Sequence, residues 1–264
     1  MFGSFGDLIR SEDNPLAKRI RSLRQRKTRE TERAFVVEGV RAVEDALAAG
    51  GNAEIILVRS DSDWMPASSG SIGTLRYLDP RLFDELSETV SPQPLLAVFS
   101  IPELIPHSDA VPFVLIADGL RDPGNLGTLL RSAAAAGVNL VLLTPGTVDA
   151  FNGKVVRAAM GAHFRIPIDQ LDDTWHDWLA YACHVRVLAD AAATREYTEF
   201  RWAGPLAIIV GSEAEGPTQI GRELASDIVR IPLENGVESL NAGVAGSLIL
   251  FEARRQLHQH NRSR

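Results

Sequence analysis

Three stretches in the second half of the chain carry polar side chains of the kinds that bind phosphate, ribose or a small ligand. In the first, the turn Asp122-Pro123-Gly124-Asn125 precedes a helix that contains Arg131. The Asn125 amide can donate and accept hydrogen bonds, and the planar Arg131 guanidinium suits phosphate or ribose oxygens. The free N–H groups at a helix start also favour anions. By itself, the stretch is more typical of an ordinary turn and helix with a surface arginine.

The second stretch, Ile208–Pro217, is an apolar strand that runs into Gly211-Ser212-Glu213 and then a Gly-Pro break. Gly211 permits close approach of the backbone to a ligand. Glu213 follows a strand, and α/β proteins bind ligands outside the carboxyl ends of their strands. The alternative is an ordinary strand exit with a solvated glutamate.

The third stretch, Ile231–Gly246, leads through Glu-Ser-Leu-Asn into a helix expected from about Leu240 to Leu257, with Ser239 as its N-cap. This helix is apolar on two faces: Leu240, Val244, Leu248 and Phe251 on one, and Ala242, Gly246, Ile249 and Ala253 on the other. Its small residues favour close packing against another backbone. We expect the helix to lie between its own domain and a partner subunit.

The elements that must position these stretches follow an α/β pattern. Residues 1–99 predict a small α/β domain, and the proline-rich residues 100–112 predict a linker. Expected in the first domain are strands at Phe35–Val37, Ile55–Val58, Thr74–Leu78 and Leu95–Phe99, with helices at Val40–Ala49 and Pro80–Ser87.

Residues 113–264 alternate strands and helices, which predicts a mostly parallel sheet covered by helices. The expected strands are Phe113–Ala117, Leu140–Thr144, His163–Pro167, Val185–Ala189, Leu206–Val210 and Ile228–Ile231. Before the last helix, further helices are expected at Leu126–Ala136, Asn152–Met160 and Thr174–Tyr181.

Composition narrows the class of protein. The chain has 264 residues, a net charge of −7 and one cysteine, Cys183, which excludes an internal disulfide and a cysteine-cluster zinc site. No apolar run reaches membrane-spanning length, and the N-terminus lacks a signal-peptide pattern. These features predict a cytoplasmic protein without a structural metal.

Charge is nevertheless concentrated near the N-terminus. Residues 18–33 hold eight basic side chains against two acidic ones. Such a run is typical either of a solvated helix face or of a phosphate-contacting patch. The basic residues taken as candidates for RNA binding are Lys18, Arg19, Arg21, Arg24, Arg26 and Lys27.

In order and in residues, the three stretches resemble the motifs of the SpoU (TrmH) family of RNA ribose 2′-O-methyltransferases, within the SPOUT superfamily. The resemblance covers roughly residues 113–255. The first domain resembles the family's small RNA-binding domain, which is related to ribosomal proteins. The residues that carry this resemblance are Asn14-Pro15-Leu16, the basic run and Phe35-Val36-Val37-Glu38-Gly39. One departure is Ala159, where relatives commonly have serine.

The resemblance implies a C-terminal domain with a deep trefoil knot, S-adenosylmethionine as cofactor, and a homodimer formed through that domain. It implies cofactor contacts, chiefly through backbone, from Gly211, Ile231 and Leu240, with Thr144, Val210 and Leu233 as weaker candidates. It also implies a catalytic set of Asn125, Arg131, Glu213, Ser239 and Asn241.

In the mechanism proposed for the family, the arginine of the first stretch, here Arg131, acts as a base and is assisted by Ser239 and the RNA phosphate. Because guanidinium normally stays charged, we hypothesise instead that Arg131 grips phosphate and stabilises a developing alkoxide.

The leading prediction is methylation of a ribose in ribosomal RNA, with transfer RNA as an alternative substrate. Base methylation is disfavoured by the Asn125/Arg131 pair. The alternative from another class is a non-catalytic RNA-binding or assembly protein that retains the fold.

Overall fold

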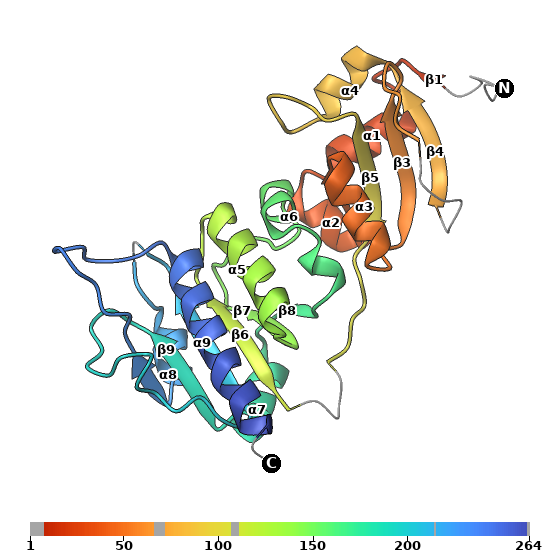
Figure 1. Cartoon of the computed structure of the whole chain (residues 1–264). Helices are drawn as coiled ribbons and strands as arrows, with labels where there is room; N and C mark the ends of the chain where they lie inside the picture. The colour runs from red at the N-terminus through yellow and green to blue at the C-terminus, as the bar shows by residue number, and fades with distance from the viewer. Residues whose placement is uncertain (1–7, 66–71, 107–110, 214, 263–264) are drawn as a thin grey trace. The chain divides into compact units, whose positions relative to one another are not determined.

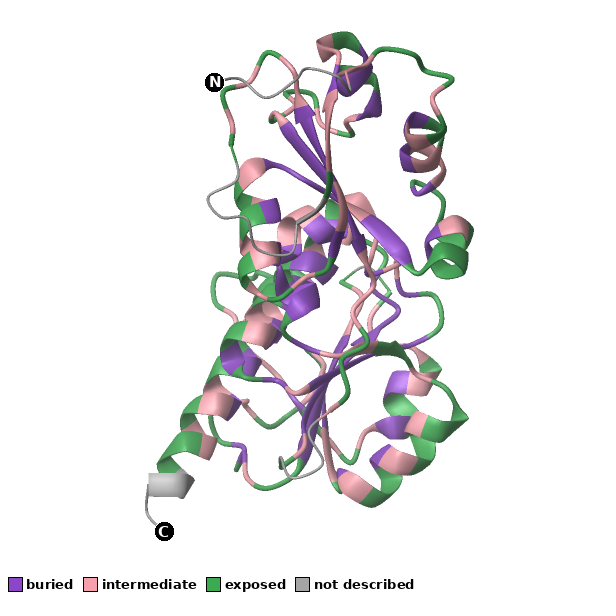
Figure 2. Cartoon of the chain, turned by 90° about the vertical axis from the view of Figure 1, so that its right-hand side faces the viewer, coloured by how far each residue is buried: buried purple, intermediate pink, exposed green. Residues whose placement is uncertain are grey.

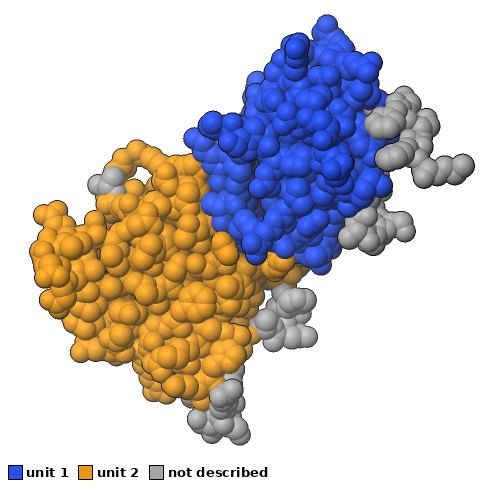
Figure 3. Space-filling model, turned by 45° about the horizontal axis from the view of Figure 1, so that its top comes forward, with its two compact units in different colours: residues 1–103, 151–164 blue, residues 104–150, 165–264 orange. Residues whose placement is uncertain are grey.

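The computed structural model describes residues 8–65, 72–106, 111–213 and 215–262, and divides them between two compact units (Figures 1 and 3). Unit 1 contains the chain up to Glu103 together with Phe151–Phe164, and unit 2 contains Leu104–Ala150 and Arg165–Arg264. The sequence predicted a domain boundary near residue 100, and residues 107–110 of the predicted linker lie outside the described residues. Phe151–Phe164, assigned to the second domain from sequence, belongs instead to unit 1.

Unit 1 is built on a five-stranded mixed sheet with the order β1-β4-β3-β5-β2. β5 pairs antiparallel with both β2 and β3, whereas β4 pairs parallel with β3 and β1. The strands are β1 (Leu8–Ile9), β2 (Ala34–Glu38), β3 (Ala53–Arg59), β4 (Ile72–Leu78) and β5 (Leu95–Ser100). The helices are α1 (Pro15–Ser22), α2 (Arg26–Glu32), α3 (Val40–Ala48), α4 (Pro80–Leu86), α6 (Gly153–Ala159) and the 3₁₀ turn η1 (Ala162–Phe164).

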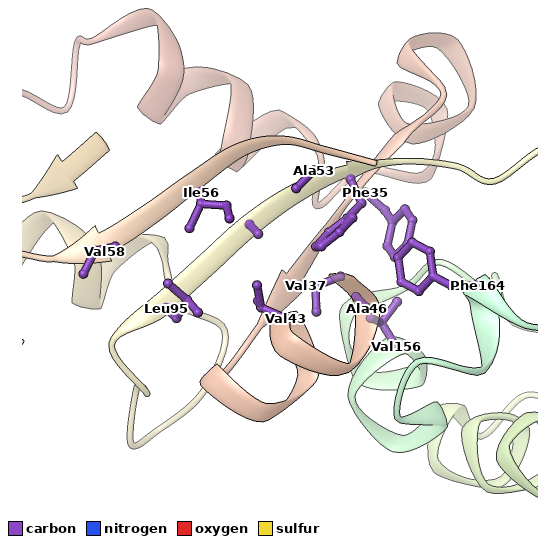
Figure 4. Close-up of a cluster of buried hydrophobic side chains, with 12 residues drawn as sticks. Phe35, Val37, Val43, Ala46, Ala53, Ile56, Val58, Leu95, Val156 and Phe164 are labelled. Atoms are coloured by element: carbon purple, nitrogen blue, oxygen red, sulfur yellow. The ribbon is translucent and has the colours of Figure 1, made fainter. Parts of the chain in front are cut away.

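Aromatic packing explains why Phe151–Phe164 belongs to unit 1. The Phe35 ring on β2 stacks on Phe164 at 5.7 Å between centroids and lies 5.0 Å from Phe151. Val156 and Phe164 enter the same apolar cluster as the β2 and β3 side chains (Figure 4). Periodicity along the chain cannot show this, because the partners lie more than a hundred residues apart.

Unit 2 contains a six-stranded sheet with the order β11-β9-β10-β6-β7-β8, in which every described strand pair is parallel. This confirms the predicted mostly parallel α/β fold. The strands are β6 (Phe113–Asp118), β7 (Leu140–Leu143), β8 (Ile168–Gln170), β9 (Val185–Ala189), β10 (Leu206–Gly211) and β11 (Asp227–Val229). The helices are α5 (Pro123–Ala136), α7 (Asp173–Ala182), α8 (Gln219–Leu224) and α9 (Ala242–Arg262).

The strand order brings the first two sequence motifs together. β6 and β10 are neighbours in the centre of the sheet, and Gly211 is in register with Asp118 at their carboxyl ends. The chain after β6 forms α5 and then β7 on one side, whereas β10 is flanked on its other side by β9. The reversal of strand order at this point is where open parallel sheets bind ligands.

The C-terminal helix α9 packs closely on α5 and β10, as its small residues predict. A Cβ added at Gly246 would lie 2.5 Å from Leu129 Cδ1 and 3.0 Å from Val210 Cγ2, and one at Gly243 would lie 3.1 Å from the Asn125 carbonyl oxygen. The buried and exposed stripes of this helix alternate in Figure 2. Val244, Leu248 and Phe251 remain between 41% and 50% exposed.

Several predicted elements differ from the structure; α5, for example, begins at Pro123, three residues before the expected Leu126, so Asn125 lies in its first turn. The expected strand His163–Pro167 is wrong: Ala162–Phe164 form η1, and the strand β8 begins at Ile168. His163 is buried and packs on the rings of Phe35 and Phe151. The apolar residues around it therefore belong to a buried turn and not to a strand. The last helix begins at Ala242, two residues later than expected.

We expect Gly246→Val to lower the free energy of unfolding by about 1–3 kcal/mol, because the added atoms overlap buried Leu129 and Val210. Urea denaturation measures this. The control is Ala180→Val on the exposed face of α7, which should change stability by less than about 0.5 kcal/mol. Equal effects of the two variants would contradict the close packing of α9.

Candidate active site

A cavity of about 170 Å³ lies at the carboxyl ends of β9, β10 and β11 and is closed on one side by the start of α9. Its floor is apolar, from side chains of Val210, Ile231, Leu233, Leu240 and Ile249. Among the predicted cofactor contacts, Gly211, Ile231, Leu240, Val210 and Leu233 line this cavity. Of the predicted catalytic residues, Glu213 and Ser239 line it, whereas Asn125, Arg131 and Asn241 do not.

Beside the cavity, the three motifs meet in one hydrogen-bonded group. The Asn125 side-chain amide donates to Glu213 Oε1, and the Asn241 amide donates to Asn125 Oδ1 at 2.6 Å. Glu213 Oε1 also accepts the backbone N–H of Ala242 at 2.6 Å. The tertiary structure therefore brings together three of the five predicted catalytic residues, which come from three separate segments.

Asn241, and not Ser239, caps α9. Asn241 Oδ1 accepts the backbone N–H of Val244 at 3.1 Å, the bond that an N-cap side chain makes. The Ser239 hydroxyl is exposed and makes no hydrogen bond to any described residue. The prediction of Ser239 as N-cap was wrong because Ser and Asn both cap helices well, and sequence spacing alone did not separate them. The Ser239 hydroxyl, which caps no helix, is therefore available on the cavity wall to bind another group.

Arg131 lies on α5, one and a half turns after Asn125. Its side chain is exposed and makes no ion pair or hydrogen bond within the described part of the chain. An arginine with no internal partner keeps all its donors for an external group. This agrees with a position off the buried stripe of α5, whose apolar residues are fully buried.

Gly211 is required for close packing within the chain. A Cβ at this position would lie 2.8 Å from the Pro217 backbone, so the glycine permits the return of the loop after β10. The prediction from sequence attributed the glycine to a ligand. The loop that it admits forms part of the cavity wall through Gly216 and Pro217.

Asp118 is a buried carboxylate that the sequence analysis did not select. It accepts hydrogen bonds from Thr144 Oγ1 at 2.9 Å, and from the Thr218 N–H and hydroxyl at 2.7 Å each. Thr144, a predicted cofactor contact, is fully buried in this network and does not line the cavity. Asp118 therefore joins the end of β6 to the loops after β7 and β10.

Asp190, which lines the cavity after β9, was also not selected. Its Oδ2 accepts from Arg222 at 3.0 Å, and its Oδ1 accepts the Ala192 N–H at 2.9 Å. Asp118 and Asp190 each follow an apolar strand, as Glu213 does. Applying the strand-end rule to every strand would have identified both.

Most of the predicted RNA-contacting cations in unit 1 have carboxylate partners. Arg19 pairs with Glu32 and Glu54 at 2.7 and 2.8 Å. The remaining pairs are Lys18 with Asp13, Arg21 with Glu12 and Glu85, Arg24 with Glu88, and Arg26 with Glu30. Lys27 is exposed without a partner in the described residues. Much of the charge of this run is thus neutralised within unit 1.

The described residues do not support a metal site, a membrane-spanning helix or a reactive cysteine. They contain no group of three or more His, Cys, Asp or Glu side chains that could hold a metal ion, and no helix long and apolar enough to cross a membrane. Burial raises the pKa of the Cys183 thiol to about 11, so this cysteine is a protonated core residue and a poor nucleophile.

Comparison with known proteins identifies the family. The model of the SpoU rRNA Methylase family matches residues 112–251, and that of the MRM3-like substrate binding domain matches residues 14–97. The chain belongs to the SpoU rRNA methylase family. It is 35% identical over 248 residues to the 23S rRNA (guanosine(2553)-2′-O)-methyltransferase RlmP of Bacillus subtilis, covering 93% of this chain and 98% of that protein.

Two further rRNA methyltransferases are similar to this chain over most of its length. Mouse mitochondrial rRNA methyltransferase 3 is 31% identical over 307 residues, covering 93% of this chain and 73% of that protein. The crystal structure of an AdoMet-bound rRNA methyltransferase from Sinorhizobium meliloti superposes with a TM-score of 0.79 at 29% identity, covering 95% of this chain and 98% of that one.

The corrected cap leads to a stability test. Asn241→Ala should lower the free energy of unfolding by about 1 kcal/mol, because it removes an N-cap. Ser239→Ala should change it by less than about 0.5 kcal/mol. Urea denaturation of both variants decides the point, and a larger loss for Ser239→Ala would restore Ser239 as the cap.

Proposed function

We propose that this SpoU-family protein transfers the methyl group of S-adenosylmethionine to the 2′-hydroxyl of a ribose in ribosomal RNA. The observation that carries the proposal is the meeting of Asn125, Glu213 and Asn241 beside a cavity lined by most of the predicted cofactor contacts. The three motifs are distant in the chain and meet at the carboxyl ends of the strands, where open α/β sheets bind ligands.

The cavity fits the chemistry of S-adenosylmethionine. Its apolar floor, with Ile231, Leu233 and Leu240, suits the flat adenine, and the carboxylates of Asp190 and Glu213 suit a cofactor that carries a sulfonium and an ammonium cation. When bound, the cofactor supplies an electrophilic methyl group. The residues that would hold it are Gly211, Ile231, Leu240, Val210 and Leu233; buried Thr144 is not retained.

The remaining polar groups suit alignment of an RNA ribose. Arg131 is charged, exposed and without an internal partner, so it can bind a phosphate beside the target ribose and stabilise negative charge that develops on the 2′-oxygen. The unbonded Ser239 hydroxyl on the cavity wall can accept or donate a hydrogen bond to the same group. Asn125 donates to Glu213 and accepts from the Asn241 amide, so the two asparagines form one hydrogen-bonded chain beside the cavity.

Ribosomal RNA is favoured over transfer RNA as substrate because the chain matches the MRM3-like substrate binding domain as well as the methylase domain, and because its relatives named above are rRNA methyltransferases. A cytoplasmic location is part of the proposal, by analogy with the RlmP relative of Bacillus subtilis. A non-catalytic RNA-binding protein is the alternative, and calorimetry with S-adenosylmethionine distinguishes it, since it predicts no cofactor binding.

The knot and the dimer also belong to the proposal. A trefoil knot in unit 2 is supported by family membership and by the cavity itself, whose walls come from loops after three neighbouring parallel strands. A homodimer is supported by the apolar stripe Val244, Leu248 and Phe251, which is about half exposed on a helix whose buried stripe packs on α5 and β10.

Arg131→Lys should lower the methylation rate by about a hundredfold or more, because a point charge replaces a bidentate donor at the developing oxyanion. Binding of S-adenosylmethionine should be unchanged by calorimetry. Exposed Arg201→Lys in the same unit is the control and should retain activity. Full activity of the Arg131→Lys enzyme would exclude a need for the arginine fork.

Phe251→Asp should convert a dimer into a monomer, because a charge replaces an exposed aromatic ring within the apolar stripe. Light scattering after gel filtration measures the mass. Tyr181→Asp on α7, where the tyrosine is 84% exposed, is the control and should leave the mass unchanged. A wild-type chain that is monomeric at all concentrations tested would refute the dimer.

A further inference from the structure

Unit 1 holds a second cavity, of about 310 Å³, at the carboxyl end of β2. It is lined by the start of α3, by the loop before β5 and by the end of α6. The lining residues are Glu38, Gly39, Arg41, Ala42, Thr89, Ser91, Gln93, Arg157 and Met160. The Phe35–Gly39 stretch, noted in the sequence for its resemblance alone, thus ends in a cavity wall.

Glu38 makes this wall rigid. Its side chain is 6% exposed, and its carboxylate accepts hydrogen bonds from the Ser87 hydroxyl, from Thr89 Oγ1 at 2.5 Å and from the Glu88 N–H at 3.1 Å. Arg157 lies 3.7 Å from the same carboxylate. Because these donors occupy both oxygens of Glu38, its acceptor capacity is consumed inside unit 1.

The other polar side chains of the cavity can donate hydrogen bonds. Gln93 Oε1 accepts the Val40 N–H at 3.1 Å, so the NH₂ of this amide points elsewhere and has no partner in the described residues. Arg41 and Ser91 are exposed and likewise make no side-chain hydrogen bond or ion pair in the described part of unit 1. Arg157 Nη1 lies 3.7 Å from both Glu38 and Glu88, so Arg41 is the cation among the lining residues that has no carboxylate partner in the described part of unit 1.

We propose that this cavity binds a phosphodiester group of the RNA substrate, with Arg41, Gln93 and Ser91 as its donors. The Arg41 guanidinium and the free Gln93 NH₂ offer only donors, and the Ser91 hydroxyl can also donate, so a group with several acceptor oxygens, such as phosphate, suits them. The basic run on α1 and α2 is largely paired with carboxylates, whereas Arg41 is not. The inference rests on the proposed function, since it assigns the RNA contact within unit 1.

Two substitutions test this without disturbing the fold. Arg41→Gln removes an exposed, unpaired charge and keeps the helix propensity of α3. Gln93→Glu keeps the oxygen that accepts from Val40 but replaces the free NH₂ by a second carboxylate oxygen. The control is Arg81→Gln on α4, an exposed arginine of the same unit outside the cavity.

The measurement is the affinity of the full chain for purified 23S rRNA by filter binding over a series of salt concentrations. Arg41→Gln should weaken binding about tenfold and lower the slope of log affinity against log salt by about 0.7, the value for one single-strand phosphate contact. Gln93→Glu should weaken binding at least as much while stability to urea is retained. Arg81→Gln should match the wild type.

Three results would overturn the proposal. One is wild-type affinity and salt slope for both cavity variants when the wild type binds 23S rRNA. Another is loss of inorganic phosphate binding in Arg41→Gln, by calorimetry, with unchanged RNA affinity, which would make the cavity a site for free anions. A wild-type chain with no affinity for 23S rRNA removes the proposed function itself and this inference with it.

Discussion

The carboxylate of Glu213 is the interaction on which the site of unit 2 depends. It stands at the end of β10 and accepts N–H groups from the Asn125 amide and from the first residue of α9. A carboxylate that receives N–H groups at a helix start is stabilised by the helix dipole as well as by the bonds. One oxygen of Glu213 therefore holds the start of α9 and the first turn of α5 at the end of the central strand.

The second constraint is the close approach of α9 to the rest of unit 2. Gly243 and Gly246 leave no room for a Cβ, and this proximity brings Asn241 to Asn125 across 116 residues of chain. Behind them, buried Asp118 ties the ends of three segments with its hydrogen bonds. A buried carboxylate is stable only when it is fully bonded, so its loop partners cannot move independently. The cavity wall is consequently built before any ligand enters.

The two units divide the work that a methyltransferase of the SpoU family requires. Unit 2 holds a largely apolar cavity with exposed Ser239 on its wall and carries exposed Arg131 on α5, whereas unit 1 carries cations on a mixed sheet. In unit 1, ion pairs and hydrogen bonds within the unit distinguish the cations that stabilise the fold from those left for a partner. Arg29 is an example of the first kind: it is buried and donates to the Leu23 and Arg24 carbonyl oxygens at 2.7 Å. Counting basic residues in a run cannot make this distinction.

The sequence by itself determined the alternation of strands and helices, the parallel sheet of unit 2 and the three motifs, because each depends on local periodicity and turn chemistry. Strands β6, β9 and β10 agree with expectation to within a residue. Only the tertiary structure decided that Phe151–Phe164 packs in unit 1, that Asn241 caps α9, that Gly211 accommodates Pro217, and that most of the basic run is neutralised. The physical reason is the same in each case: the deciding partner is distant in the chain, and local pattern carries no information about which distant atom fills a given space.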